Sequence, residues 1–110
     1  MASIPKLLKR FIEGGESERN SAGMKLVKIG AGRVLPEVLK AFALHAREAP
    51  HLLALLGSLY ETAGKADRAT IKDVLTRYTE LSANSAAEEI LIESARMQLQ
   101  VIAWIDQEQG

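Results

Sequence analysis

The sequence contains no cysteine and no long apolar run, and each absence removes a class of function. Without cysteine the 110-residue chain has no disulfide, no thiol nucleophile and no cysteine–zinc site. No uninterrupted apolar stretch approaches the roughly 18 residues that a membrane-spanning helix needs. Lys9, Arg10 and Glu13 interrupt what would have to be the apolar core of a secretory signal. We therefore expect a cytoplasmic protein and do not expect a membrane partner.

Residue types that carry catalysis or bind metals are also sparse. The two histidines, His45 and His51, lie on either side of Pro50, so they do not share one face of a continuous helix. Gly30 and Gly32 superficially resemble a phosphate-binding turn, but the third glycine of that motif would fall at Leu35. We expect no catalytic residue, no metal site and no cofactor, and thus not an enzyme.

What the sequence does contain is helical periodicity. Hydrophobic residues make up 47% and charged residues 25%, which is typical of a folded globular domain. Apolar residues recur at helical spacing and no stretch reads convincingly as a strand. The pattern predicts an all-α protein, a small bundle of about five helices. It divides into an amphipathic helix within residues 1–13, a flexible linker over 14–23 and a helical bundle over 24–110.

The boundaries within the bundle follow from glycine, proline and capping residues. Residues 24–35 predict a helix that is broken, because Pro36 cannot sit mid-helix without a break or kink. Cleaner helices are predicted over 36–48, 50–63 and from Thr70 to about residue 81. A last helix of about twenty residues is predicted to start at Ser85, which with Glu88 has the spacing of a capping box.

The first helix is predicted over residues 4–13, with Ser3 as its cap. Its five large apolar residues occupy an arc of about 140° on one side. Because a helix of this length is marginal alone, this stripe must dock on a surface. The surface could belong to its own bundle, to a second copy or a different protein, or, least favoured, to an anionic membrane.

The last helix is apolar around most of its circumference, so it must be covered on several sides. It is predicted to be the central helix of the bundle, either wholly inside it or partly in contact with another subunit. The partner-binding residues predicted from both helices are Ile4, Leu7, Leu8, Phe11, Ile12, Leu99 and Trp104.

The net charge of zero hides two oppositely charged halves. Residues 1–47 hold nine basic and four acidic side chains, a charge of +5, and residues 48–110 hold five basic and ten acidic ones, a charge of −5. Such a division fits uneven solvated charge, self-complementary packing or a basic surface for nucleic acid. The candidate phosphate-binding residues are Lys6, Lys9, Arg10, Arg19, Lys25, Lys28 and Arg33.

By exclusion of chemistry, the sequence favours a non-catalytic protein-interaction or assembly protein. It would be a small adaptor, regulator or structural subunit that binds another protein or a second copy of itself, with a homo-oligomer expected. The alternative is a small helical nucleic-acid-binding subunit that uses the basic N-terminal half.

Overall fold

A computed structural model describes residues 3–45 and 48–109, and these residues form six helices and no strand. The helices are α1 (Ile4–Glu13), α2 (Glu16–Ile29), α3 (Ala31–Leu44), α4 (Ala49–Tyr60), α5 (Lys65–Thr79) and α6 (Ala86–Gln109). The prediction of an all-α bundle is confirmed, with six helices in place of about five. None of the helices in the described part of the chain is long and apolar enough to cross a membrane.

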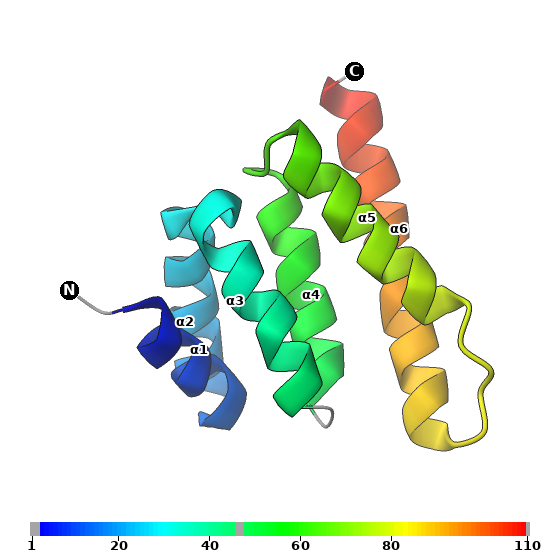
Figure 1. The fold of residues 1–110 in the computed structure, drawn as a ribbon, viewed down its shortest axis with the longest axis horizontal. Helices are drawn as coiled ribbons and strands as arrows, with labels where there is room; N and C mark the ends of the chain where they lie inside the picture. The colour runs from blue at the N-terminus through cyan, green and yellow to red at the C-terminus, as the bar shows by residue number, and fades with distance from the viewer. Residues whose placement is uncertain (1–2, 46–47, 110) are drawn as a thin grey trace.

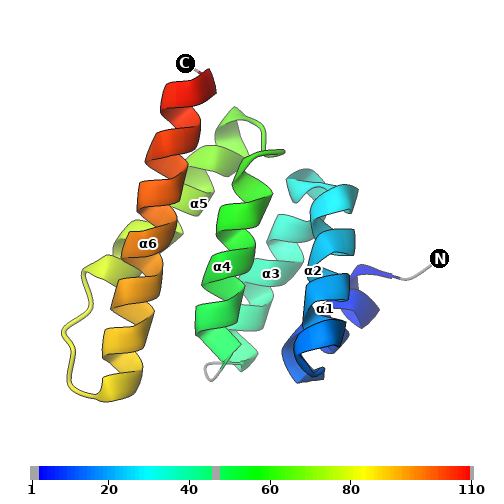
Figure 2. The same cartoon turned by 180° about the vertical axis from the view of Figure 1, so that it is seen from behind.

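The six helices lie in two layers. Helices α1, α3 and α5 are nearest the viewer in Figure 1, and α2, α4 and α6 are nearest in Figure 2. The molecule is a slab of 40 × 36 × 22 Å, so each layer has one broad outer face. Helices α4 and α6 run in the same direction, because Ser94 in the first half of α6 lies by Pro50 at the start of α4, and Asp106 near the end of α6 lies by Tyr60 at the end of α4. Below, the outer face of α2, α4 and α6 is called the α2–α4–α6 face.

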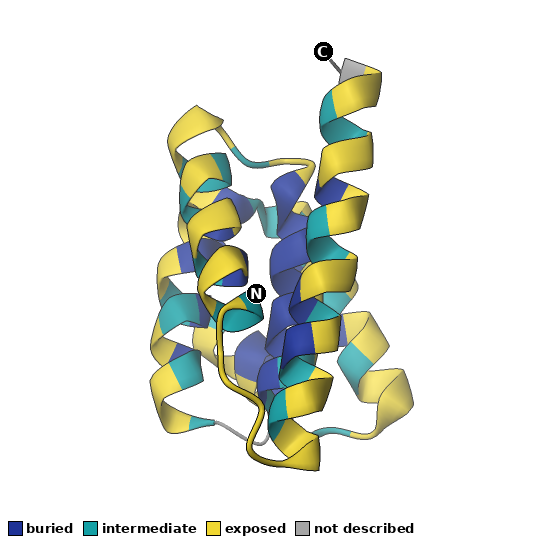
Figure 3. Ribbon diagram, turned by 90° about the vertical axis from the view of Figure 1, so that its right-hand side faces the viewer, coloured by how far each residue is buried: buried dark blue, intermediate teal, exposed yellow. Residues whose placement is uncertain are grey.

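The centre of the core is α4 and not the last helix. Leu52, Leu53, Leu56 and Leu59 of α4 are completely buried. Helix α6 packs mainly on α4 and α5 and lies at the edge of the slab, with much of its surface exposed (Figure 3). The prediction that α6 is central is therefore wrong. A helical wheel shows how wide an apolar surface is, but not whether the chain itself covers that surface.

Helix α4 and helix α6 pack closely at Gly57. A methyl group at Gly57 would overlap the amide of Gln98 on α6. Ala95, three residues before Gln98, is completely buried. Small side chains let two helix backbones approach one another, which accounts for a glycine inside α4 despite its cost of about 1 kcal/mol relative to alanine.

Helix α1 forms as predicted, and it docks on its own chain. Ser3 caps it by accepting a hydrogen bond from the Lys6 backbone N–H, and the stripe of Leu7, Leu8, Phe11 and Ile12 is buried in the common core. Burying four such side chains contributes about 1.5–3 kcal/mol each. The surface on which the α1 stripe docks is therefore that of its own bundle.

The flexible linker predicted over residues 14–23 is wrong from Glu16 onward, because those residues form the first half of α2. Only Ala22 and Leu26 of α2 are buried, so its sequence carries little amphipathic signal. Contacts with α1 supply the missing stabilisation. The Phe11 ring packs against Gly23, and a Cβ there would lie 3.3 Å from that ring.

The break predicted in the next segment occurs at Gly30 and not at Pro36. Gly30 ends α2 and begins α3 with φ of 105° and ψ of 150°, a region that is essentially restricted to glycine. Pro36 lies inside α3 without ending it.

Two other helix starts can be compared with the predicted ones. Helix α5 begins at Lys65, five residues before the predicted start, and the hydroxyl of Thr70 donates to the Ala66 carbonyl inside that helix. The predicted cap of the last helix is confirmed. The Glu88 backbone N–H donates to Ser85 Oγ at 3.3 Å, and the Ser85 hydroxyl donates to the Glu88 carboxylate at the same distance.

Two interhelical turns are built alike. The sequences FIEGGESER (11–19) and YETAGKADR (60–68) each place an arginine four residues after a glycine. Arg19 Nε donates to the Phe11 carbonyl at 2.9 Å, and Arg68 Nε donates to the Tyr60 carbonyl at 3.1 Å. Each arginine thereby satisfies a carbonyl near the C-terminus of the preceding helix, where the helix itself supplies no donor.

The second of these turns also anchors α6. Asp106 accepts a hydrogen bond from the Tyr60 hydroxyl at 2.8 Å and pairs with Lys72 at 2.7 Å. The Lys72 ammonium and then the Tyr60 hydroxyl hold the pKa of the Asp106 carboxyl below its usual range. Arg68 lies over the Tyr60 ring, 4.7 Å from its centroid. This cluster fixes the rotation of α6 about its own axis.

A candidate protein-interaction surface

Helix α6 carries an exposed apolar seam, which consists of Ile90, Met97, Val101 and Trp104. At about 100° per residue these four side chains lie within a 60° arc, and three of them recur every seven residues. Met97 is 61% exposed and Trp104 is 64% exposed. Seven-residue spacing of apolar side chains is typical of a helix that packs lengthwise against another helix.

The seam points to the α2–α4–α6 face. Asp106, which reaches α5 through Lys72, lies nine residues from Met97, or about 180° around the helix. Gln98, which faces Gly57 of α4, lies about 100° from Met97. The seam is therefore directed away from α5 and flanks α4.

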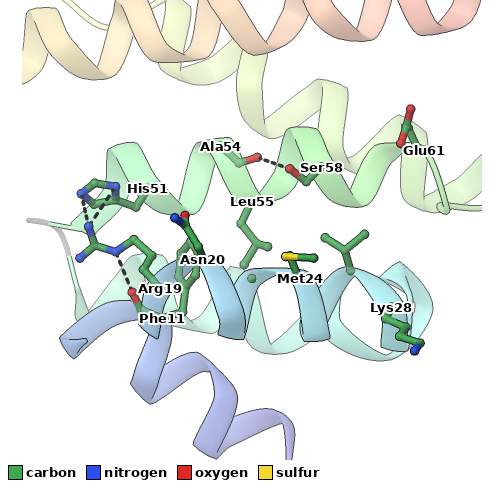
Figure 4. A pocket seen from close by; sticks show the side chains of 12 residues that line it. Phe11, Arg19, Asn20, Met24, Lys28, His51, Ala54, Leu55, Ser58 and Glu61 are labelled. Carbon is green, nitrogen blue, oxygen red and sulfur yellow. Dashed lines mark hydrogen bonds between the residues drawn. The ribbon is translucent and has the colours of Figure 1, made fainter. Parts of the chain in front are cut away.

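The same face contains a groove between α2 and α4, of about 630 Å³ (Figure 4). Phe11, Val27 and Leu55 supply much of its apolar lining, and Met24 stands at its rim with 75% of its surface exposed. In Figure 4, Leu55 extends from α4 toward α2. The groove exists because α2 and α4 touch one another much less extensively than α4 and α6 do.

Each end of the groove carries charge. At one end Arg19 lies 3.1 Å from His51 Nε2, so α2 and α4 are linked there. Partial burial, and secondly the Arg19 charge, lower the pKa of His51 from its ordinary value of 6.5, while Glu48 opposes this shift. At the other end lie Lys28 of α2 and Glu61, just beyond the end of α4.

Small side chains separate the groove from the seam. Ala54 and Ser58 of α4 are exposed and also line the groove. The Ser58 hydroxyl donates to the Ala54 carbonyl of its own helix, at 3.3 Å, so it adds no free polar group that projects from the surface. The side chains of α4 thus project little from this face, and the groove and the α6 seam on either side are accessible from the same direction.

The structure places the predicted partner-binding residues in different environments. Leu7, Leu8, Phe11 and Ile12 are buried, and Ile4 and Leu99 are half-buried against the core. Trp104 alone is well exposed. Sequence reasoning missed Ile90, Met97 and Val101 as contact residues, although their spacing relative to Trp104 was visible in the sequence. It also missed Met24, because the groove joins segments far apart in the chain.

The predicted phosphate-binding residues are distributed over several features of the surface. Lys6, Lys9 and Arg10 line a depression of α1 together with Glu13 and Glu18. Arg10 and Lys25 line a second depression between α1 and α2. Arg19 is engaged at the end of α1, Lys28 belongs to the groove, and Arg33 lies in the first turn of α3. Acidic side chains interrupt the densest part of the basic region, which weakens it as a phosphate-binding surface.

The described residues contain no group of three or more histidine, cysteine, aspartate or glutamate side chains placed to hold a metal ion. The chain matches no protein-family model, and neither a curated protein nor a solved structure shows significant similarity to it.

Proposed function

We propose that this chain is a non-catalytic protein-interaction or assembly protein, and that the α6 seam is its contact surface. The observation that carries the proposal is the row of four large apolar side chains on one exposed face of α6, including the single tryptophan of the sequence. Exposed apolar patches of this kind mark interaction sites, and tryptophan is enriched among the residues that dominate binding energies.

The packing of α6 supports this role. Asp106 attaches the C-terminal part of α6 to α4, and the capping box at Ser85 stabilises the first turn of α6, so the seam is presented on a well-formed helix. A rigid surface loses little conformational entropy on binding. Self-association is part of the proposal, because the charge division of the chain supplies complementary surfaces on two copies.

The proposal is tested by photo-crosslinking. A photoreactive residue replaces Met97 in the full chain, in the cells that naturally produce the protein. Leu81, an exposed apolar residue in the loop before α6, receives the same replacement as a control. We expect discrete protein adducts from position 97 and none from position 81. No adduct from position 97, or the same adducts from both, would contradict the proposal.

The alternative of nucleic-acid binding stays a prediction. The feature in its favour is the cluster of Lys6, Lys9 and Arg10 on α1, which are exposed and lie near one another. The acidic residues among them make this function the weaker candidate.

A further inference from the structure

We propose that the occupant of the α2–α4 groove is the α6 seam of a second copy, in a two-fold dimer in which each copy inserts its seam into the other's groove. This inference rests on the proposed function, because it uses the same seam, and it adds the partner and the receiving surface. Three observations carry it: the position of the two features on one face, their charge, and the size of the face.

The first observation is that seam and groove lie side by side on the α2–α4–α6 face, separated only by Ala54 and Ser58. A two-fold axis that lies in the interface, parallel to α4 and passing over these small residues, places each seam over the other copy's groove. A closed two-fold interface uses the same surface patch on both copies. Small side chains at the axis let the two α4 helices approach closely.

The second observation is the distribution of charge. Helices α2, α4 and α6 run in the same direction, and a two-fold axis parallel to α4 keeps that direction, so the incoming α6 runs parallel to the walls of the groove. Trp104 of the second copy then lies at the Lys28 end, where the lysine ammonium can approach the face of its ring. Glu93 of the second copy, level with the start of α4, then lies at the Arg19–His51 end. Exposed acidic side chains on α6 thus meet basic side chains of α2, and the arrangement occurs twice.

The third observation is the extent of the surface. The face measures about 40 × 36 Å from the dimensions of the slab. A stable interface buries about 800 Å² on each partner, little more than half of such a face. The groove volume of about 630 Å³ holds several side chains of a docked helix.

The test uses one substitution in each feature. Met97→Glu places a charge in the seam, Met24→Glu places one at the rim of the groove, and Leu81→Glu is the control away from the face. All three side chains are exposed, so the variants should fold, which circular dichroism checks. Sedimentation velocity of the full chain, up to about 1 mM, measures the dimer.

We expect the unaltered chain and Leu81→Glu to form dimers, and each of the other two variants to dimerise at least about tenfold more weakly. An equimolar mixture of Met97→Glu and Met24→Glu should associate more tightly than either variant alone. In that mixture one intact groove, on the first variant, meets one intact seam, on the second.

Two results would overturn the inference and leave the assignment of the α6 seam as a contact surface standing. A Met24→Glu chain that dimerises as tightly as the unaltered chain would show that the groove does not receive the seam. A monomeric unaltered chain whose position 97 still crosslinks to another protein would show that the seam serves a different partner. Normal dimerisation of Met97→Glu, by contrast, would overturn the reciprocal dimer, and the proposed function would fail as well if position 97 also gave no adduct.

Discussion

Replacing Leu7 with alanine tests whether α1 belongs to the cooperative core. Leu7 is 2% exposed and lies in the core cluster to which all six helices contribute. Leucine-to-alanine substitution at such a site removes transfer free energy and leaves a cavity, a loss of about 2–5 kcal/mol. A domain of this size has a free energy of unfolding of about 5–15 kcal/mol, so the loss is a large part of the total.

The matched control is Leu44→Ala, because Leu44 also lies in a helix but is 78% exposed. We expect the free energy of unfolding of this variant to change by less than about 0.5 kcal/mol.

Urea unfolding followed by circular dichroism measures both variants. The midpoint concentration should fall strongly for Leu7→Ala, with an unchanged dependence on urea, if α1 unfolds together with the rest. A Leu7→Ala chain as stable as the Leu44→Ala chain would refute the conclusion that α1 is part of the core. A decrease in the urea dependence would instead show that α1 separates from a core that unfolds independently.

Three further predictions concern the backbone, acid and nucleic acid. Gly30→Ala should lower the free energy of unfolding by about 1–3 kcal/mol, because the φ of 105° at this position suits only glycine. Gly32→Ala, in the open first turn of α3, should raise the free energy of unfolding or leave it unchanged. Thermal unfolding measures both variants. The folded state holds the pKa of His51 below 6.5, so the unfolded chain binds a proton first, and stability should fall as the pH drops through 6.5 toward that lowered pKa. His51→Gln should make stability less dependent on pH in urea titrations across that range. An unchanged pH dependence would contradict the lowered pKa of His51. Mixed single- and double-stranded nucleic acid should not bind at low salt; binding that weakens steeply with added salt would favour the alternative function.

Where the fold could be predicted, the signal was local. The apolar arc of α1 and its Ser3 cap predicted the bounds of that helix correctly, and the Ser85–Glu88 pair predicted the start of α6. Both signals involve residues three or four apart, which periodicity and capping rules describe.

Helix α2 could not be predicted because its stability is not local. Its first half is polar, and the contacts that hold it there come from Phe11 and from the end of α1 through Arg19. The likeness of residues 11–19 and 60–68 was present in the sequence and would have indicated a tight helical turn at this point.

The candidate surface was partly accessible from the sequence. Trp104 was identified, but α6 was placed at the centre because its apolar residues surround most of its axis. The groove was not accessible, since Val27 and Leu55 are distant in the chain and only the tertiary fold brings α2 beside α4.

The most direct test of the account is the fluorescence of Trp104, the single tryptophan, measured as the concentration of the full chain rises. Because Trp104 is exposed in the isolated chain, its emission should begin at the long wavelengths of a water-exposed indole and shift to shorter ones as dimers form. Met24→Glu should suppress the shift over the same concentrations. Emission that stays constant while the sedimenting mass doubles would place the contact elsewhere and contradict the assignment of the α6 seam.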